Sequence, residues 1–331
     1  MKRRVCYISR YRLKGYNSIE ELFMGIKAAM SKIHPCNWYT LKCTGGHPWV
    51  IFKNLWSVKP NNDVVYHITG DVHYMAIRLG RKAVLTVHDV GSILKTKSSV
   101  KLLYLKLFWF WWPAARVRYI TVISEFTKKE LAQIIPRYRH KIKVIPNPVH
   151  SIFEYHSKPF NSELPTILLI GTKPNKNLEH TLKALHGIPC KLLIVGELND
   201  AQKRLLNDGA YAYNNVSNCT LSEIYQCYVQ CDLLCFVSTY EGFGMPIIEA
   251  QAAGRPVITS NVGAMKEVAG DAALLVSPQS KTALRDAVLE IVQNTDLRTS
   301  LVNRGLKNVK RFSLNAVTLK YNALYEQIQI D

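Results

Sequence analysis

The chain has 331 residues, of which 48% are hydrophobic and 20% are charged, so a disordered protein is excluded and two folded domains are expected. Lys and Arg number 43 against 24 Asp and Glu, and residues 1–150 hold 26 basic and 7 acidic residues while residues 151–331 hold 17 of each. The whole excess of positive charge therefore lies in the first half, where it favours phosphates, anionic lipid surfaces or nucleic acid.

Short apolar runs alternate with helix-like segments along the first half of the chain. The predicted strands are Val5–Ser9, Val64–Ile68, Ala83–Val87, Tyr119–Ile123 and Ile142–Ile145. Helices are predicted over Ser18–Ile33 and Glu125–Ile135, and this alternation indicates a parallel sheet covered on both faces. Residues 146–165 contain four prolines and no clear period, so we expect a linker there.

The same alternation restarts after the linker. The predicted strands are Thr166–Ile170, Lys191–Val195, Leu233–Val237 and Val257–Ser260. Helices are expected to begin near Asn177, near Ser222 as an N-cap, and at Pro246, and residues 280–328 are expected to form two or three more. Two α/β domains of Rossmann type are therefore predicted, covering residues 1–150 and 151–331, with a cleft between the carboxyl ends of their sheets.

The most specific segment runs from Ser238 to Ala250 and reads STYEGFGMPIIEA. It follows a predicted strand and opens a helix, so its backbone amides can bind phosphate and its glycines allow close approach. Glu241 and Glu249 can both face that site, although each taken alone could be a solvated Glu or one that caps a helix dipole. Two carboxylates beside a phosphate site suit the hydroxyls of a sugar and a ribose.

A second segment, LLIGTKPNKNL over residues 168–178, places Lys176 just before a helix. A lysine there can neutralise a diphosphate leaving group, and the alternative is a surface lysine near a turn.

Together these segments resemble glycosyltransferase family 4, whose members have the GT-B fold and an E-x7-E motif. The resemblance implies a retaining enzyme that needs no cofactor and takes a sugar from a nucleotide diphosphate sugar. It implies that Glu241 contacts the donor sugar as a catalytic residue and that Glu249 contacts the ribose. The other donor-binding residues that it implies are Thr172, Lys173, Lys176, Gly242, Phe243, Gly244 and Met245. Many members have an Arg where Thr172 stands. Lys173 is a candidate to take the place of that Arg, although lysine lacks the planar guanidinium that donates two parallel hydrogen bonds to a phosphate.

The first domain resembles the family more loosely. His88 ends a predicted strand in the segment TVHD, and the resemblance implies a catalytic position near the donor sugar. A single His is otherwise more often structural. The loop from Arg10 to Asn17 occupies the place of the glycine loop of the family, so Gly15 and Tyr16 are implied to bind the acceptor. The last helix is expected to return to this first domain.

Several other chemistries lack their motifs. No DxD pair follows a strand, so metal-dependent sugar transfer is not expected, and no GxGxxG or GxxxxGK[ST] motif indicates a nicotinamide enzyme or an NTPase. The eight cysteines form no CxxC pair, which predicts free thiols, no zinc site and a cytoplasmic protein. The N-terminus is interpreted as a first strand and not a signal peptide, and no apolar stretch is long enough to span a bilayer.

Residues 101–118 combine basic flanks with the aromatic run from Phe108 to Trp112. This pattern indicates either an interfacial anchor or a helix buried against the first sheet. With the basic first half, it leads us to expect peripheral contact with an anionic inner leaflet.

The function that we expect is hexosyl transfer, without a metal, to a glycan or lipid-linked acceptor in polysaccharide biosynthesis. A nucleic-acid-binding protein would account for the charge alone, and a nucleotide-sugar epimerase would act on the donor alone. Neither nucleic acid nor a metal is expected as a partner.

Overall fold

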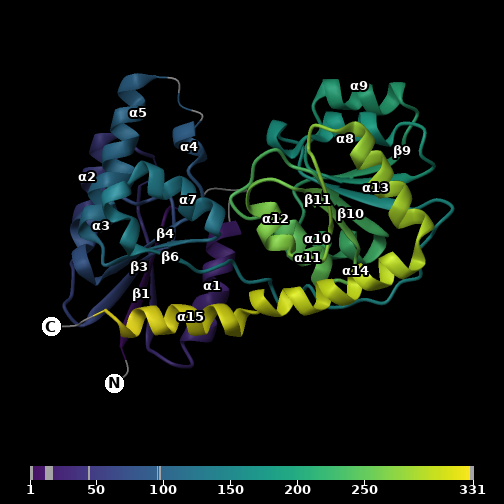
Figure 1. Cartoon of the computed structure of the whole chain (residues 1–331). Helices are drawn as coiled ribbons and strands as arrows, with labels where there is room; N and C mark the ends of the chain where they lie inside the picture. Colours follow the sequence, from purple (N-terminus) through teal and green to yellow (C-terminus); the bar gives the residue numbers. More distant parts are fainter. Residues whose placement is uncertain (1–2, 12–17, 44, 95, 97, 329–331) are drawn as a thin grey trace. The chain divides into compact units, whose positions relative to one another are not determined.

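The structure of the protein is a computed structural model that describes residues 3–11, 18–43, 45–94, 96 and 98–328. The chain forms two compact units (Figure 1). Unit 1 comprises Met1–Pro148 together with Leu314–Asp331, and unit 2 comprises Val149–Ser313.

Unit 1 contains a parallel sheet of six strands in the order β2-β1-β3-β4-β5-β6. The strands are β1 (Arg4–Ser9), β2 (Cys36–Thr40), β3 (Val64–Ile68), β4 (Ala83–Val87), β5 (Tyr119–Val122) and β6 (Ile142–Val144). The central strand β4 is buried along its whole length, as expected for a parallel strand covered on both faces. All five strands predicted for this half are confirmed to within two residues, and β2 was not predicted.

Helices and helical turns connect these strands. They are α1 (Ser18–Met30), α2 (Pro48–Ser57), α3 (Met75–Leu79), η1 (Gly80–Lys82), α4 (Gly91–Leu94), α5 (Ser99–Leu105), η2 (Lys106–Trp111), α6 (Trp112–Arg116), α7 (Glu125–Ile134) and η3 (Pro136–Lys141). The α7 helix begins after Ser124, whose side chain accepts a hydrogen bond from the Thr127 amide and so caps the helix.

The aromatic run in residues 108–112 divides between the core and the surface. Phe110 is 3% exposed and packs in the core, whereas Trp111 and Trp112 are 48% and 46% exposed. The indole N–H of Trp111 donates to the carbonyl oxygen of Ile134 at 2.8 Å. The interpretation as a buried helix therefore holds for Phe110, whereas the interfacial anchor stays a prediction for the exposed Trp111 and Trp112.

The last helix, α15 (Leu314–Glu326), belongs to unit 1, where it packs beside α1 (Figure 1). A buried polar network joins it to the sheet. The two ring nitrogens of His67 lie 2.5 Å from the Tyr325 hydroxyl and 2.7 Å from the Thr86 hydroxyl. Burial lowers the pKa of His67 to about 3, so the ring is neutral and the network is held by hydrogen bonds and not by charge.

Unit 2 repeats the architecture with six parallel strands in the order β12-β11-β10-β7-β8-β9. The strands are β7 (Thr166–Ile170), β8 (Lys191–Val195), β9 (Ala212–Val216), β10 (Leu233–Phe236), β11 (Val257–Ser260) and β12 (Leu274–Val276). The four strands predicted here are confirmed, and the edge strands β9 and β12 were not predicted.

The helical elements of unit 2 are η4 (Pro174–Lys176), α8 (Leu178–Leu185), α9 (Asp200–Asp208), α10 (Leu221–Gln230), α11 (Met245–Ala252), α12 (Gly263–Ala269), α13 (Lys281–Gln293), α14 (Thr295–Asn308) and η5 (Val309–Phe312). The N-cap prediction for Ser222 is wrong, because Thr220 caps α10 in a reciprocal pair with Glu223. With α15, the tail forms three helices, as predicted.

The prediction of two α/β domains with parallel sheets is confirmed. Among the described residues, no helix is both long and apolar enough to cross a bilayer.

Candidate active site

The predicted donor residues of unit 2 lie at the point where the strand order of its sheet reverses. The chain passes from β7 outward to β8 and β9, and then returns to β10 on the other side of β7. In open α/β sheets, ligands bind outside the carboxyl ends of the strands at such a point. The loops after β7 and β10 carry Lys176 and Glu241 respectively, so the topology brings these two side chains together.

Hydrogen bonds join the two loops directly. The Thr239 amide donates to the Asn175 carbonyl oxygen at 2.8 Å. The Asn175 side chain donates back to the Tyr240 carbonyl oxygen at 3.1 Å and to the Glu241 carboxylate at 3.2 Å. Asn175 therefore positions the loop that carries Glu241, a role that sequence reasoning missed although the residue lies next to Lys176.

Lys176 and Glu241 form an ion pair, with the Lys176 Nζ 2.7 Å from the Glu241 Oε1. The two side chains are 21% and 16% exposed, so the pair is largely shielded from solvent yet accessible. The aliphatic stem of Lys176 lies against Gly171, where a Cβ atom would come within 2.8 Å of the stem. Gly171 also has φ +90°, so glycine is required both by the backbone and by the lysine above it.

Glu249 lies in the second turn of α11 and is held by Tyr228 of α10. The Tyr228 hydroxyl donates to the Glu249 Oε2 at 2.7 Å. Burial raises the pKa of the Glu249 carboxyl to about 7, and the Tyr228 hydrogen bond and the Lys176 charge offset only part of that effect. No sequence motif pointed to Tyr228, because only the tertiary fold brings this residue of α10 to Glu249.

The backbone between the two glutamates opens α11. Gly244 is the N-cap residue with φ +109°, a conformation that L side chains rarely adopt, and Pro246 lies in the first turn as predicted. Phe243 is buried and packs edge-on against the ring of Phe312 at 5.6 Å between centroids. The side chain of Phe243 is thus part of the core, and it is the amides of Gly242–Met245 that can meet a diphosphate.

The side chains of Thr172 and Lys173 differ in their contacts and in their exposure. The Thr172 hydroxyl donates to the Glu197 carbonyl oxygen at 2.6 Å, which joins the loops after β7 and β8. Lys173 is exposed at the start of the η4 turn. The structure therefore gives the Thr172 side chain a partner within the fold, and the role of Lys173 as a donor-binding residue stays a prediction.

His88 lies in unit 1 beyond the carboxyl end of β4. Its Nε2 is 2.7 Å from the Thr69 carbonyl oxygen, which can only accept, so the proton resides on Nε2. Burial lowers the pKa of His88, and the neutral ring keeps Nδ1 as an acceptor. Gly70 lies against the ring, where a Cβ atom would come within 2.9 Å of it.

The predicted acceptor residues Gly15 and Tyr16 lie outside the described residues. The strand order of the first sheet reverses between β1 and β3. Arg10, just after β1, bonds to Glu20 at 2.9 Å and to Asp71, which follows β3. Sequence reasoning missed this charged cluster, and Asp71 has φ 46°, which is uncommon for a residue other than glycine.

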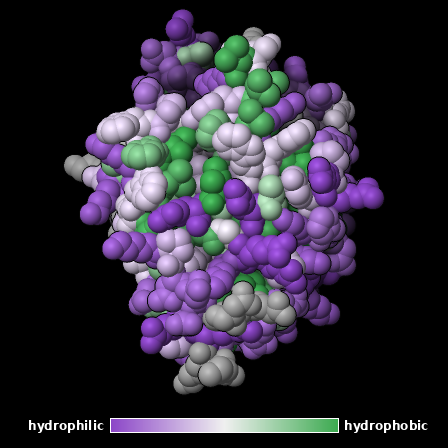
Figure 2. Space-filling view, turned by 90° about the vertical axis from the view of Figure 1, so that its left-hand side faces the viewer, coloured by the Kyte–Doolittle hydropathy of each residue, from purple (hydrophilic) through white to green (hydrophobic). Residues whose placement is uncertain are grey.

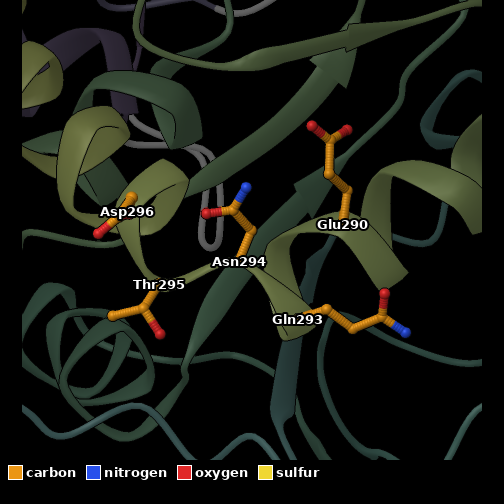
Figure 3. Close-up of a pocket in the computed structure, with 5 residues that line it drawn as sticks. All are labelled: Glu290, Gln293, Asn294, Thr295 and Asp296. Atoms are coloured by element: carbon orange, nitrogen blue, oxygen red, sulfur yellow. The ribbon is translucent and has the colours of Figure 1, made fainter.

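A hollow of 480 Å³ elsewhere in unit 2 contains none of the predicted residues (Figure 3). It lies where α13 meets α14 and is lined by Glu290, Gln293, Asn294, Thr295 and Asp296. These side chains point in different directions, and Asn294 is occupied in capping α14 (Figure 3). Its acidic lining does not suit a phosphate ligand. Among the described residues, no group of three or more His, Cys, Asp or Glu is placed to hold a metal.

Two family models match the chain in succession. The model "Glycosyltransferase Family 4" matches residues 44–151, and "Glycosyl transferases group 1" matches residues 153–308. The chain belongs to glycosyltransferase family 4. The resemblance carried by Lys176, Glu241 and Glu249 is thereby confirmed at the level of the family, and this chain is a glycosyltransferase.

Relatives and solved structures agree with this assignment. The chain is 27% identical to O-antigen chain mannosyltransferase B of Escherichia coli, covering 82% of this glycosyltransferase and 76% of the relative. It is 26% identical to O-antigen chain mannosyltransferase RfbU of Salmonella typhimurium, covering 80% and 73%. The structure of Anabaena Alr3699/HepE in complex with UDP-glucose superposes with a TM-score of 0.75 at 14% identity, covering 98% and 99%. The GT-B fold is therefore confirmed.

Proposed function

We propose that this glycosyltransferase moves a mannosyl residue from a nucleotide diphosphate sugar to a glycan or glycolipid acceptor in cell-surface polysaccharide synthesis. The observation that carries the proposal is the Lys176–Glu241 pair at the switch point of the unit 2 sheet. Glu241 accepts hydrogen bonds from the donor sugar, and Lys176 with the Gly242–Met245 amides takes the diphosphate. Glu249 accepts from the ribose hydroxyls.

Two kinds of similarity support the proposed donor and acceptor. The names of both relatives describe mannosyltransferases that act on O-antigen chains, which supports mannose and a polysaccharide acceptor. The Anabaena neighbour binds UDP-glucose, which supports a nucleotide sugar. We propose that unit 2 binds this donor with Thr172 and Lys173 at its margin, and that unit 1 binds the acceptor through Gly15 and Tyr16. We place His88 near the donor sugar.

We propose that transfer retains the anomeric configuration. Both carboxylates of the candidate site are already engaged, Glu241 with Lys176 and Glu249 with Tyr228, so we assign neither of them as a nucleophile. The departing phosphate oxygen can then take the proton of the acceptor hydroxyl on the same face of the sugar. The two alternative functions from the sequence make different predictions. An epimerase would convert the donor without an acceptor. A nucleic-acid-binding protein would not bind nucleoside diphosphates at this site.

A donor panel tests the proposal. GDP-mannose, UDP-glucose and UDP-N-acetylglucosamine would be compared by calorimetry and by transfer to lipid-linked oligosaccharide, and the anomeric configuration of the product would be read by NMR. Preference for a mannosyl donor and a retained configuration are expected. An inverted product, conversion of the donor alone, or failure of every nucleoside diphosphate to bind would contradict it.

Replacing Lys176 by alanine is expected to weaken nucleoside diphosphate binding by about tenfold or more, because a charge-assisted contact is lost and the Glu241 carboxylate is left unpaired beside the diphosphate. At a pH well above the pKa of Glu249, which the Lys176 charge helps to lower, the affinity for the free nucleoside should change little. Calorimetry with both ligands measures the difference, and Lys191→Ala, an exposed lysine at the opposite end of β8, is the matched control. Equal losses for the two ligands would place Lys176 away from the phosphates.

Transfer is expected to persist in excess EDTA. The sequence has no DxD pair after a strand, and the α11 amides together with Lys176 can balance the charge of the diphosphate. Initial rates would be measured with EDTA and after adding back Mn²⁺ or Mg²⁺. A rate that collapses in EDTA and returns with either metal would show that a metal is needed.

A further inference from the structure

The α2 helix exposes aromatic side chains where a surface helix normally exposes polar ones. Trp49, Phe52 and Trp56 are 61%, 51% and 63% exposed. They follow a helical spacing and contact one another, with ring centroids 5.7 Å apart for Trp49 and Phe52 and 6.0 Å apart for Phe52 and Trp56. These three side chains form one continuous stripe, which we call the α2 aromatic face. Exposed patches of this kind mark interaction sites.

The opposite side of α2 is fixed in the core of unit 1. Ile51 is buried, and the side chain of the fully buried Asn54 donates to the Tyr74 hydroxyl at 2.8 Å and to the Cys43 carbonyl oxygen at 2.9 Å. Because this polar anchor sets the rotation of the helix, α2 cannot turn its aromatic side chains inward. The α2 aromatic face is therefore a fixed surface of the fold.

Cations flank the aromatic rings. The Lys53 Nζ lies 5.5 Å from the centre of the Trp49 ring, and the Arg78 guanidinium lies 4.8 Å from that of Trp56. Neither cation forms an ion pair with a carboxylate in the described part of the chain. Residues 41–118 hold 12 Lys and Arg against three Asp and no Glu. The segment of the chain that contains the face is thus strongly basic and carries few acidic residues.

Neighbouring elements extend the surface. The Tyr104 hydroxyl of α5 donates to the Gly46 carbonyl oxygen at 2.6 Å, which holds α5 beside the start of α2. Val100 and Leu103 of α5 are 81% and 59% exposed. Figure 2 views the molecule from the side on which Figure 1 places α2 and α3, and hydrophobic side chains gather in its upper and central parts among hydrophilic ones.

We propose that the α2 aromatic face docks on an anionic lipid bilayer, with Trp49, Phe52 and Trp56 inserted at the headgroup level and Lys53 and Arg78 against lipid phosphates. Tryptophan suits this depth because its ring is apolar and its N–H is polar. Charge complementarity favours a bilayer over a second copy of the chain as the partner of this face. Two chains that each carry a net charge of +19 repel one another, whereas an anionic bilayer attracts the chain. This docking goes beyond the proposed function, since it requires no donor and no catalysis.

Vesicle flotation tests the proposal with the full chain. Vesicles of phosphatidylcholine alone would be compared with vesicles containing about 30% phosphatidylglycerol, at low and high salt. Wild type should float with the anionic vesicles at low salt. The triple variant Trp49→Ser, Phe52→Ser, Trp56→Ser should bind them about tenfold or more weakly, because the exposed apolar area is lost. Tyr155→Ser with Tyr213→Ser, which removes two exposed aromatics from unit 2, is the matched control and should bind as wild type does.

A second variant reports insertion directly. Trp49→Phe with Trp56→Phe should keep vesicle binding while quenching of tryptophan fluorescence by acyl-brominated lipid falls. Calorimetry with a nucleoside diphosphate should give the same affinity for wild type and for every variant, which keeps a failure of docking apart from a failure of donor binding.

Four outcomes would overturn docking on lipid. Wild type could stay unbound on anionic vesicles at low salt, or the triple variant could float as well as wild type. A single-stranded oligonucleotide could bind in place of vesicles and be lost in the triple variant, which would make the face a nucleic-acid site. Size-exclusion chromatography could show a dimer that the triple variant abolishes, which would make it an interface between copies.

Discussion

Alanine in place of Glu241 is expected to lower the rate of sugar transfer by about a hundredfold or more and to leave the fold intact. The carboxylate accepts from Asn175, pairs with Lys176 and lies in a loop, so its removal creates no cavity in the core. In the proposed complex it holds donor hydroxyls as the sugar departs, where an oriented charge contributes most. Initial rates at saturating donor measure the loss, and the melting temperature of the variant checks the fold.

Two further variants make this test specific. Glu290→Ala removes an exposed carboxylate of the same unit at the α13–α14 hollow, and its transfer rate should match that of wild type. Lys176→Ala combined with Glu241→Ala should lose less than the product of the two single losses, because the side chains are in contact and act together. A folded Glu241→Ala variant that transfers sugar within a few-fold of wild type would remove Glu241 from the site.

The strands that could be predicted from the sequence are the buried ones. β4 and β10 are buried along their length and appear as continuous apolar runs. The edge strand β9 reads AYNNV and is largely exposed, and β12 has only three residues, so neither has a pattern that separates it from a loop. The Thr220 cap was readable, because Thr220 and Glu223 have the spacing of a capping box.

The residues of the candidate site that lie in local motifs could be predicted from the sequence, whereas the contacts between them could not. The two glutamates and Lys176 lie in segments whose glycines and strand ends mark a ligand loop. The contact between Lys176 and Glu241, and the support from Asn175, depend on how β7 pairs with β10. The support of Glu249 depends on a hydrogen bond from Tyr228, which lies 21 residues earlier in the chain. Those contacts join residues far apart in the chain and have no local signature.

The affinity for a nucleoside is expected to rise by roughly 30-fold between about pH 5.5 and about pH 8. Burial raises the pKa of Glu249 from 4.5 to about 7, so the carboxyl is mostly protonated at the lower pH and mostly ionised at the higher. Ribose hydroxyls donate hydrogen bonds, and an ionised carboxylate accepts them best. The free nucleoside is the right ligand, because a phosphate group would itself titrate near pH 6.

The same raised pKa affects stability in the opposite direction. The pKa of the Glu249 carboxyl is higher in the folded than in the unfolded chain, so its contribution to the free energy of unfolding is fully present below about pH 4.5. As the pH rises from there to about 7, this contribution is lost, by up to about 3 kcal/mol. Glu249→Gln keeps an oxygen for the Tyr228 hydroxyl but cannot ionise. In urea unfolding, this variant should gain stability over wild type as the pH rises through that range, while its nucleoside affinity becomes weak and independent of pH.

Tyr228→Phe separates an effect on Glu249 from a purely structural one. The Tyr228 hydroxyl donates to the Glu249 carboxylate and lowers its pKa, so its removal should raise that pKa and move the rise of nucleoside affinity to higher pH. A tyrosine that only filled the core would change stability and leave the midpoint of the affinity curve unchanged. Nucleoside titrations across the pH range with wild type, Tyr228→Phe and Glu249→Gln decide the matter. A flat curve for wild type would show that Glu249 does not bind the ribose as an ionised acceptor.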